Sequence, residues 1–295
     1  MSTLLRLPFT APPIGTFIEA HYEGRAEINR LAGETFEIQA CDRCGLVFQK
    51  NVPHGPLLQD LYDVWIPRSE RERLRRAAGL VDYRYMASQV DFLIQFFGRK
   101  PCEISVFDFG LGWCEWASVA QSYGCEVSGS ELSVERVEYA RSRGIRIVDW
   151  NEIPGQGFDF INTEQVFEHL IEPRETLQHL VRGLRVGGVI KISVPDGRNM
   201  RDRVARLAGM REVTRAFILP IQPLEHVNCF NHRSLAELGR QAGLEVMRPS
   251  LRMLYNGCSG WLEPRQGLKN LVRPIYRHLF PGSTFIYFMR AGSGA

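Results

Sequence analysis

Apolar and polar stretches alternate regularly from residue 104 onward, and they predict strands and helices in turn. Short apolar runs predict five strands, at Ser105–Phe109, Glu126–Gly129, Ile145–Val148, Phe158–Asn162 and Val189–Val194. Helical patterns between them cover Cys114–Ser122, Val134–Arg143 and Glu175–Leu184, and Gly124, Gly144 and Gly187–Gly188 stand where these helices should end. Two late apolar runs, Leu244–Met247 and Thr284–Met289, can complete the sheet. This alternation indicates an α/β fold with a mostly parallel sheet and helices on both faces.

The first predicted strand runs into a glycine turn, V-F-D-F-G-L-G-W-C, at Val106 to Cys114. An acidic residue, Glu131, follows the second predicted strand. Glycines allow a ligand to approach the backbone closely, and a carboxylate can accept two hydrogen bonds from a ribose diol. The pairing therefore favours a nucleoside site, and the alternative is an ordinary strand–turn–helix whose glycines serve tight packing.

Two cofactors use similar glycine turns, and the spacing separates them. Dinucleotide sites need G-x-G-x-x-G. Counting from Gly110, the last position falls on Glu115, where a pyrophosphate would meet a carboxylate at a helix N-terminus. The S-adenosylmethionine pattern, D-x-G-x-G-x-G, matches at Asp108, Gly110 and Gly112, with Cys114 in place of the third glycine.

Residues from about 85 to 250 resemble the class I S-adenosylmethionine-dependent methyltransferases, in particular the small-molecule enzymes with an E-H-L pattern after the fourth strand. The matching segments are F-D-F-I-N-T-E-Q-V-F-E-H-L, Phe158 to Leu170, and L-R-V-G-G-V-I-K-I-S-V-P, Leu184 to Pro195. The resemblance implies a Rossmann-like fold with a seven-stranded, mostly parallel sheet, and S-adenosylmethionine as cofactor.

The resemblance also implies roles for individual residues. The turn would line the methionine end of the cofactor, Glu131 would hold the ribose, and the residues after the third strand would hold and cover the adenine. Glu164 would face the cofactor or the transferred methyl group, and Asp108 would mainly orient the turn. The predicted cofactor residues are Asp108, Gly110, Leu111, Gly112, Glu131, Leu132, Asp149, Trp150 and Glu164.

A long insertion follows the fifth predicted strand, at about residues 196–230. Ligands bind at the carboxyl ends of strands in open sheets, so we expect this insertion to form a lid that sets acceptor specificity. It ends in P-L-E-H-V-N-C-F-N, Pro223 to Asn231, which resembles a stretch of the sugar C-methyltransferases whose histidine acts as general base. His226 is therefore the candidate base, with Glu225 as its partner. A histidine that only packs the lid is the alternative, and His169 is interpreted as mainly structural.

The first 84 residues have a character of their own. C-D-R-C-G-L-V-F-Q-K, Cys41 to Lys50, resembles half of a small zinc module found before some sugar and natural-product methyltransferases. A structural zinc site needs four ligands, and residues 1–40 contain no cysteine. Zinc on Cys41 and Cys44 stays open, and a knuckle that packs without metal is preferred. Aromatic residues that follow, Tyr62, Tyr83 and Tyr85, suggest that one of them lines the active site. We expect two parts, residues 1–84 and a methyltransferase domain at 85–295.

The composition limits the kinds of partner and the location that we expect for the protein. The net charge of +3 is too small to indicate nucleic acid, and the arginine-rich stretch Arg68–Arg76 contains Glu70 and Glu72, which favours a solvated helix. The sequence contains no run of 18 uncharged apolar residues, so no membrane span is predicted. Seven cysteines without a regular pairing pattern, and a start that lacks signal-peptide features, favour the cytoplasm.

Three functions rank in order. The first is methyl transfer from S-adenosylmethionine to a small-molecule, glycan or natural-product acceptor. The second is a catalytically silent relative that serves as a binding or partner subunit. The third, a nucleic-acid methyltransferase, is disfavoured because N-T-E-Q, Asn162 to Gln165, replaces the Asn/Asp-Pro-Pro-aromatic motif of enzymes that modify base amino groups. The oligomeric state and the atom that receives the methyl group stay open.

Overall fold

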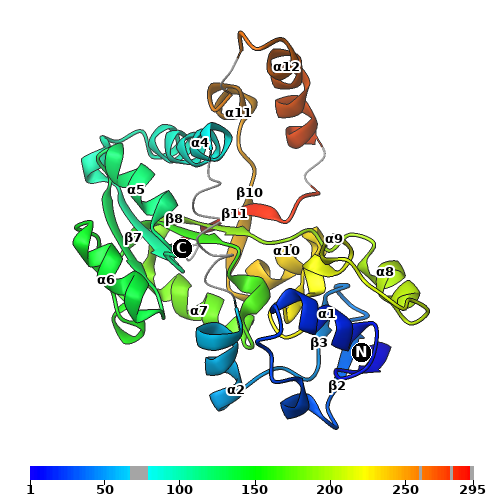
Figure 1. Ribbon diagram of the computed structural model, residues 1–295. Helices are drawn as coiled ribbons and strands as arrows, with labels where there is room; N and C mark the ends of the chain where they lie inside the picture. Colours follow the sequence, from blue (N-terminus) through cyan, green and yellow to red (C-terminus); the bar gives the residue numbers. More distant parts are fainter. Residues whose placement is uncertain (67–78, 259–260, 280–281, 293–295) are drawn as a thin grey trace. The chain divides into compact units, whose positions relative to one another are not determined.

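The computed structural model describes residues 1–66, 79–258, 261–279 and 282–292 (Figure 1). The chain divides into two compact units. Unit 1 comprises residues 1–76, 165–173 and 194–237, and unit 2 comprises residues 77–164, 174–193 and 238–295. The insertion at about 196–230 thus belongs to the same unit as the N-terminal segment. The expected division at residue 84 stays a prediction.

Unit 2 is built on a seven-stranded sheet, as the sequence predicted. Its order is β10-β11-β8-β7-β4-β5-β6, and the pairs β8–β7, β7–β4, β4–β5 and β5–β6 are parallel. Only β11 runs antiparallel to its neighbours β8 and β10. The strands are β4 (Ser105–Phe109), β5 (Glu126–Ser130), β6 (Arg146–Ile147), β7 (Phe158–Glu164), β8 (Leu184–Ser193), β10 (Leu244–Met247) and β11 (Phe285–Arg290).

Helices cover both faces of this sheet. On one face, α4 (Leu80–Phe97) and α5 (Glu115–Ser122) share a buried apolar cluster with Phe160, Val189 and Tyr287 of the strands. Tyr287 and Phe288 point to opposite faces because successive strand residues alternate, and Phe288 packs against Gly239 of α10 (His232–Gln241). The remaining helices of this part of the chain are α6 (Val134–Ser142), α7 (Pro173–Gly183), α11 (Leu251–Asn256) and α12 (Pro264–Leu279), with 3₁₀ turns at Pro101–Glu103 and Trp150–Glu152.

One predicted helix end is wrong. Gly187 and Gly188 were expected to follow α7, but α7 ends at Gly183 and β8 begins at the next residue. Gly187 has φ +74°, and the pairing of β7 with β8 shifts register nearby, between Phe158 and Phe160. The glycines therefore allow an irregularity inside β8 instead of ending a helix.

Unit 1 contains a second sheet, of four antiparallel strands, that the sequence did not predict. Its order is β1-β2-β3-β9, formed by β1 (Ser2–Pro8), β2 (Thr35–Ala40), β3 (Val47–Gln49) and β9 (Asn228–Cys229). The last strand comes from the insertion, and its residue Cys229 pairs with Val47. The insertion and the N-terminal segment are thus parts of one sheet.

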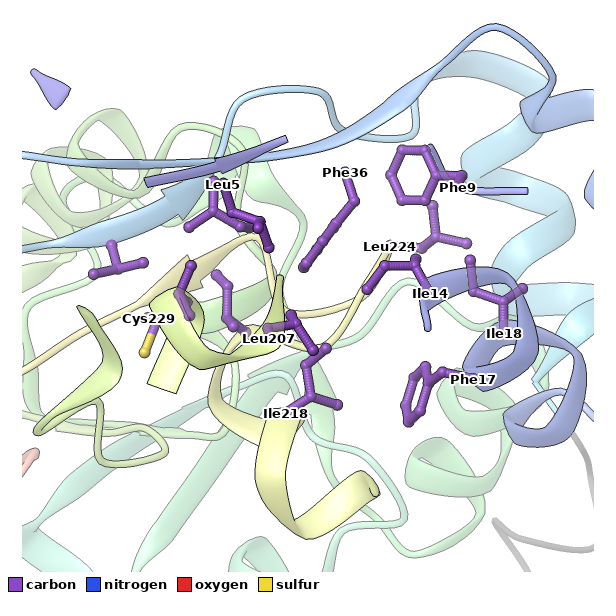
Figure 2. Close-up of a cluster of buried hydrophobic side chains, with 14 of the residues drawn as sticks. Leu5, Phe9, Ile14, Phe17, Ile18, Phe36, Leu207, Ile218, Leu224 and Cys229 are labelled. Atoms are coloured by element: carbon purple, nitrogen blue, oxygen red, sulfur yellow. The ribbon is translucent and has the colours of Figure 1, made fainter. Parts of the chain in front are cut away.

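The same two segments share the core of unit 1 (Figure 2). Phe36 of β2 and Ile14 of α1 are buried in one cluster with Leu207 of α8 and Ile218 of α9. The helices are α1 (Ile14–His21), α2 (Gly55–Asp60), α8 (Met200–Leu207) and α9 (Arg215–Ile218). Single turns of 3₁₀ helix lie at Ile28–Leu31, Phe167–His169 and Leu219–Ile221, and a π-helical turn at Leu61–Trp65. Within the described residues, no helix is long and apolar enough to cross a membrane.

Candidate functional site

Three turns of unit 2 follow neighbouring parallel strands at the carboxyl edge of the sheet. Gly110 follows β4, Glu131 follows β5, and Asp149 comes shortly after β6. Phe109 is paired with Ser130, and Gly129 with Ile147, so the three strand ends lie side by side. With strands about 4.8 Å apart, the three turns span roughly 10 Å. The fold therefore places the predicted nucleoside residues along one edge.

The glycine turn needs the backbone freedom of its glycines. Gly110 has φ +83° and Gly112 has φ +54°, and the N–H of Gly110 donates to the carbonyl of Ser130 at 3.0 Å. Cys114, which stands where the pattern has its third glycine, also has a positive φ of +64° and precedes the first residue of α5. A non-glycine residue in this region carries backbone strain.

The Glu131 carboxylate is held by backbone groups on both sides. One oxygen accepts hydrogen bonds from the N–H groups of Leu132 at 2.9 Å and Ser133 at 3.0 Å. The other accepts from the N–H of Gly112 at 2.9 Å and has a longer contact of 3.5 Å with Arg136. The side chain is only 10% exposed. Glu131 thus joins the turn after β4 to the turn after β5.

Exposed apolar side chains lie in the turns that follow β5 and β6. The Leu132 side chain is fully exposed and the Trp150 side chain is 43% exposed. The Trp150 ring stacks on His179 with centroids 3.8 Å apart, and the His179 Nε2–H donates to the Trp150 carbonyl at 2.7 Å. Asp149 precedes this turn, and its N–H donates to Glu152 at 3.2 Å. Trp150 is therefore held in place while part of its ring stays accessible.

A buried polar cluster lies under the end of β7. Lys191, which is fully buried, donates to the carboxylate of Glu164 and, at 2.7 Å, to the side-chain oxygen of Gln89. Glu164 also accepts from Ser193 at 2.9 Å and from the Tyr85 hydroxyl at 3.4 Å. Burial lowers the pKa of Lys191, against the opposing effect of Glu164. The side chain of Glu164 itself stays about one third exposed.

Asp108 belongs to the same edge but is buried. It accepts a hydrogen bond from the Asn162 side chain at 2.7 Å. Burial raises the pKa of Asp108 to about 7, although Asn162 and Lys191 both act to lower it. This carboxyl group is therefore buried and bonded to the neighbouring strand β7, and its expected role in orienting the turn stays a prediction.

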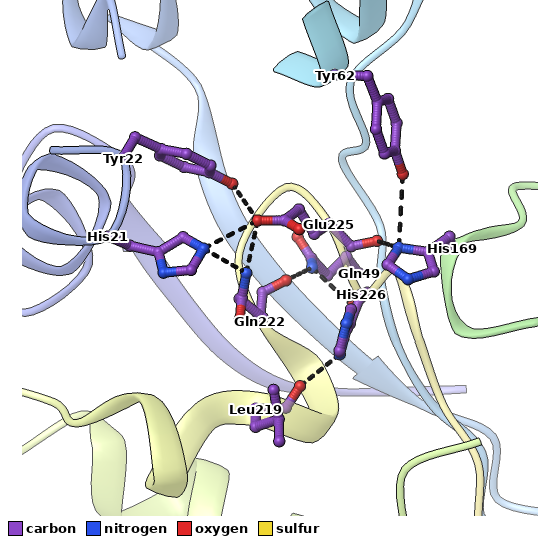
Figure 3. Close-up of polar contacts among 9 residues, drawn as sticks. All are labelled: His21, Tyr22, Gln49, Tyr62, His169, Leu219, Gln222, Glu225 and His226. Atoms are coloured by element: carbon purple, nitrogen blue, oxygen red, sulfur yellow. Dashed lines mark hydrogen bonds and ion pairs between the residues drawn. The ribbon is translucent and has the colours of Figure 1, made fainter. Parts of the chain in front are cut away.

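In unit 1, the side chain of Glu225 is enclosed by hydrogen-bond donors (Figure 3). One of its oxygens accepts from the Tyr22 hydroxyl at 2.9 Å and from Gln222 at 2.6 Å, and lies 3.0 Å from the His21 Nε2. Burial alone would raise the pKa of Glu225, but the bonds from His21 and Tyr22 outweigh it and lower that pKa. The carboxylate is thus directed to the N-terminal helix α1.

His226 is held by a different group. Its Nδ1–H donates to the backbone carbonyl of Leu219 at 2.5 Å. Burial and, after it, the nearby His169 lower the pKa of His226 to about 4, against the opposing effect of Glu225. The His169 ring meets the His226 ring edge to face, with centroids 4.7 Å apart, and its Nδ1–H donates to the carbonyl of Glu225 at 3.0 Å. The structure therefore pairs His226 with His169.

Cys41 and Cys44 lie in the turn that joins β2 to β3, where the N–H of Gly45 donates to the carbonyl of Cys41. A backbone hydrogen bond from Cys44 lowers the pKa of Cys41, whereas burial raises the pKa of Cys44. Across the described residues, the two thiols belong to no group of three or more metal-ligating side chains. Metal on Cys41 and Cys44 stays a prediction without a third ligand.

Sequence reasoning missed several of these groups. The lone lysine inside the apolar run V-I-K-I-S-V could have indicated a buried polar cluster, because a buried charge needs a partner. In the structure Lys191 has two partners, Glu164 and Gln89. The link of Glu225 to α1 had no signal, since about 200 residues separate the partners. Of the three tyrosines, Tyr85 contacts Glu164, and Tyr62 lies 3.5 Å from the His169 ring. The stretch Arg68–Arg76 lies outside the described residues.

Comparison with known proteins shows the family and the fold of this chain. A family model described as a methyltransferase domain matches residues 76–248, which is more than half of the chain. No curated protein sequence matches. Among solved structures, the plantazolicin methyltransferase BpumL, bound to a triazolic desmethylPZN analogue and SAH, has a TM-score of 0.51 at 15% identity, over 80% of this chain and 95% of that one. A putative sarcosine dimethylglycine methyltransferase from Galdieria sulphuraria has a TM-score of 0.43 at 16% identity, over 77% and 90%.

Proposed function

We propose that this chain, which belongs to the class I S-adenosylmethionine-dependent methyltransferases, transfers the methyl group to a small-molecule, glycan or natural-product acceptor. The family establishes the reaction type and the cofactor, and the acceptor class is the proposal. The observation that supports the cofactor assignment is the row of three turns at the carboxyl edge of β4, β5 and β6, with Glu131 at its centre.

The residues of this edge fit a nucleoside with a charged sulfonium side chain. We propose that the glycine turn meets the methionine end, that Glu131 meets the ribose, and that the turn after β6 meets the adenine through a carboxylate and an aromatic face. The proposed cofactor residues are Asp108, Gly110, Leu111, Gly112, Glu131, Leu132, Asp149, Trp150 and Glu164.

The fit at Glu131 depends on how many acceptor sites its carboxylate has left. A carboxylate offers about four lone-pair sites, and three are taken by the N–H groups of Gly112, Leu132 and Ser133. The fourth meets only the long 3.5 Å contact with Arg136. A ribose hydroxyl would replace that contact, and the three N–H groups would hold the carboxylate in place.

Glu164 is proposed to face the positively charged end of the cofactor. Lys191 and Ser193 fix its carboxylate, and its remaining exposed area allows it to attract a cation. S-adenosylmethionine supplies a methyl group already made electrophilic by sulfur. The chain's own task is therefore to hold the cofactor, align the acceptor and exclude water.

The acceptor class rests on features of the chain itself. N-T-E-Q at Asn162 to Gln165 lacks the prolines of enzymes that modify base amino groups, and the net charge of +3 offers little attraction for a phosphate backbone. Both features support a small or sugar-like acceptor over nucleic acid, and a cytoplasmic enzyme remains part of the proposal. The insertion at about 196–230 is proposed to set acceptor specificity.

The role of His226 as general base, with Glu225 as its partner, stays a prediction. The bond from Nδ1–H to the Leu219 carbonyl leaves Nε2 as the unprotonated nitrogen, which is the one that a base would use. A pKa of about 4 makes it a weak proton acceptor near neutral pH.

Calorimetry with S-adenosylhomocysteine tests the cofactor site. Glu131→Ala removes an ionised acceptor, and one lost charge-assisted hydrogen bond of about 1.5–3 kcal/mol predicts at least a tenfold weaker affinity. Glu135→Ala is the matched control, because Glu135 carries the same charge on an exposed position of α6. Thermal unfolding of both variants shows whether the glycine turn survives. Equal affinities for Glu131→Ala, Glu135→Ala and the unmodified chain would refute the assignment.

Transfer of a labelled methyl group tests the acceptor class. The chain is incubated with labelled S-adenosylmethionine and, separately, with a small-metabolite extract, a glycan fraction and total nucleic acid. We expect label in one of the first two fractions. Label only in nucleic acid would contradict the proposed acceptor, and cofactor binding without any transfer would favour a catalytically silent subunit.

A further inference from the structure

Three metal-ligating side chains meet in unit 1, away from the cysteine turn. Each of Glu168, His169 and His226 offers one ligand atom, and these atoms all lie within 4.8 Å of one another. Glu168 is buried and both histidines are largely so. We propose that this cluster binds one first-row divalent transition-metal ion.

The hydrogen bonds of the two histidines suit this role. Each ring donates its Nδ1–H to a backbone carbonyl, His169 to Glu225 at 3.0 Å and His226 to Leu219 at 2.5 Å. Each Nε2 is therefore the nitrogen with a free lone pair. Histidines that ligate metals almost always donate their other ring N–H to a carbonyl or carboxylate, which fixes the ring.

The segments that carry the ligands are themselves anchored. Gln49 of β3 donates to the carbonyls of Gln222 and His226, at 2.8 and 2.9 Å. Asn228 of β9 donates to the carbonyl of Leu170, at 2.6 Å, and so connects the strand after His226 to the turn that contains Glu168 and His169. The two ligand-bearing segments are thus tied to each other and to the four-stranded sheet.

Distances and donor types decide the kind of ion. Ligands of one ion, each about 2.1 Å from it, lie about 3 to 3.4 Å apart, so side-chain rotation must close part of the present spacing. Two imidazoles and one carboxylate suit zinc, cobalt, manganese or iron, and not calcium or magnesium. Three protein ligands leave positions open for water or another oxygen donor.

This role excludes the one predicted for His226 in proton transfer, because both use the same Nε2. Metal binding needs neutral imidazoles close together, and the rings of His169 and His226 lie with their centroids 4.7 Å apart. The geometry carries the inference, and it holds whichever acceptor the enzyme methylates.

Cobalt(II) titration of the untagged, metal-free full chain tests the proposal. We expect one equivalent to bind with the weak visible absorption of nitrogen and oxygen ligands, at least tenfold more weakly in Glu168→Gln and His226→Gln. The double variant Cys41→Ser/Cys44→Ser is the control and should bind as the unmodified chain does. Intense sulfur-to-cobalt absorption that the cysteine variant abolishes would overturn the proposal, as would no binding at millimolar cobalt.

Two further measurements keep the outcome clear. Paramagnetic shifts of the His169 and His226 ring resonances in the unmodified chain should appear with cobalt, and their absence while cobalt binds would refute the site even if a variant fails to fold. Affinity for S-adenosylhomocysteine is measured in parallel on Glu168→Gln. It tests the cofactor residues of unit 2, so failure of the metal site and failure of the proposed function can be told apart.

A second, independent observation concerns α12 in unit 2, whose apolar side faces solvent. Its exposed apolar side chains recur at helical spacing, and each is at least 43% exposed. They are Leu268, Leu271, Val272, Ile275, Tyr276 and Leu279. The residues turned inward are instead Asn270 and Pro274. A stripe three turns long is more than the scattered apolar residues of an ordinary surface.

Charge indicates what covers this stripe. The sequence of α12 contains no acidic residue, and Arg265, Lys269 and Arg273 follow one another at intervals of four along one side of the stripe. An exposed apolar face bordered by a row of cations is the pattern of helices that lie in the plane of a membrane interface. We infer that α12 docks on an anionic lipid surface.

Vesicle sedimentation tests this inference with the full chain. We expect binding to vesicles that contain phosphatidylglycerol, much weaker binding to pure phosphatidylcholine, and at least a tenfold loss in the variant Leu268→Ser/Leu271→Ser/Ile275→Ser. Glu245→Ser on the exposed part of β10 is a surface control. Binding that is equal for the triple variant refutes the inference. So does a dimer in light scattering that the triple variant abolishes while vesicles bind neither form.

Discussion

Substitutions at Cys114 test whether the glycine pattern of the turn reflects backbone strain. Its φ of +64° costs a residue with a Cβ about 1–2 kcal/mol, and a glycine at that position costs nothing. Glycine gives back about 0.4–1 kcal/mol because it is freer in the unfolded chain. Backbone conformation alone should therefore favour Cys114→Gly over Cys114→Ala by about 1 kcal/mol, the reverse of the usual order near a helix.

The thiol adds a second term that the alanine variant isolates. Cys114 is fully buried in a cluster with Leu111, Ala117 and Ala140, so loss of its sulfur costs about 1 kcal/mol. Cys114→Ala loses this packing and keeps the strain. Cys114→Gly loses more packing but relieves the strain, and its stability should lie within about 1 kcal/mol of the unmodified chain.

Loss of the buried Cβ costs about 0.8 kcal/mol and offsets most of glycine's backbone advantage, so the midpoints of the two variants in urea unfolding should lie within about 0.3 M of each other. Cys125 supplies the matched control, because it is also buried but does not have a positive φ. There the usual order should hold, with Cys125→Ala more stable than Cys125→Gly. If glycine is less stable than alanine by the same amount at both positions, the strain argument fails.

Two other predictions concern unit 2. Burial raises the pKa of Asp108 to about 7. Between pH 4 and 7 the carboxyl group therefore keeps its proton in the native state and loses it in the unfolded state. The free energy of unfolding should fall by about 4 kcal/mol over this range because of this one group. Asp108→Asn should thus gain stability over the unmodified chain across that range and hold the gain above it; a constant difference from pH 4 to 8 in denaturant titrations would be evidence against this. Gly239→Ala should lose about 1–3 kcal/mol in thermal unfolding, because the added Cβ would lie 2.2 Å from the buried Phe288 ring, whereas Gly257→Ala meets nothing closer than 3.7 Å and should be neutral.

The sequence predicted the seven-stranded sheet well because most of its strands have a recognisable local sequence pattern. The strands β4 and β10 have the predicted bounds, and β5 and β7 extend the predictions by one and two residues. β4 and β7 are largely apolar runs with mostly buried residues, as is usual for parallel strands in the middle of a sheet. The glycine turn was equally readable, since its positive φ angles at Gly110 and Gly112 require glycine at fixed spacing, and its role in cofactor binding stays a prediction.

The second sheet had no comparable signal. β9 is only two residues long, and its partner β3 lies about 180 residues earlier in the chain. Pairing over such a separation depends on tertiary packing, which no local pattern records. The same reason hid the meeting of Glu168 and His169 with His226, because the two segments are more than 50 residues apart.

This long-range pairing changes how the N-terminal segment should be understood. In the sequence it looks like a separate segment that precedes the seven-stranded sheet and contains a motif similar to half of a zinc module. In the structure, Phe36 and Ile14 of that segment share one core with Leu207 and Ile218 of the insertion. Neither segment can bury its apolar side chains without the other. The insertion that is proposed to choose the acceptor therefore owes its shape to the N-terminal segment, and a substitution in either one acts on both.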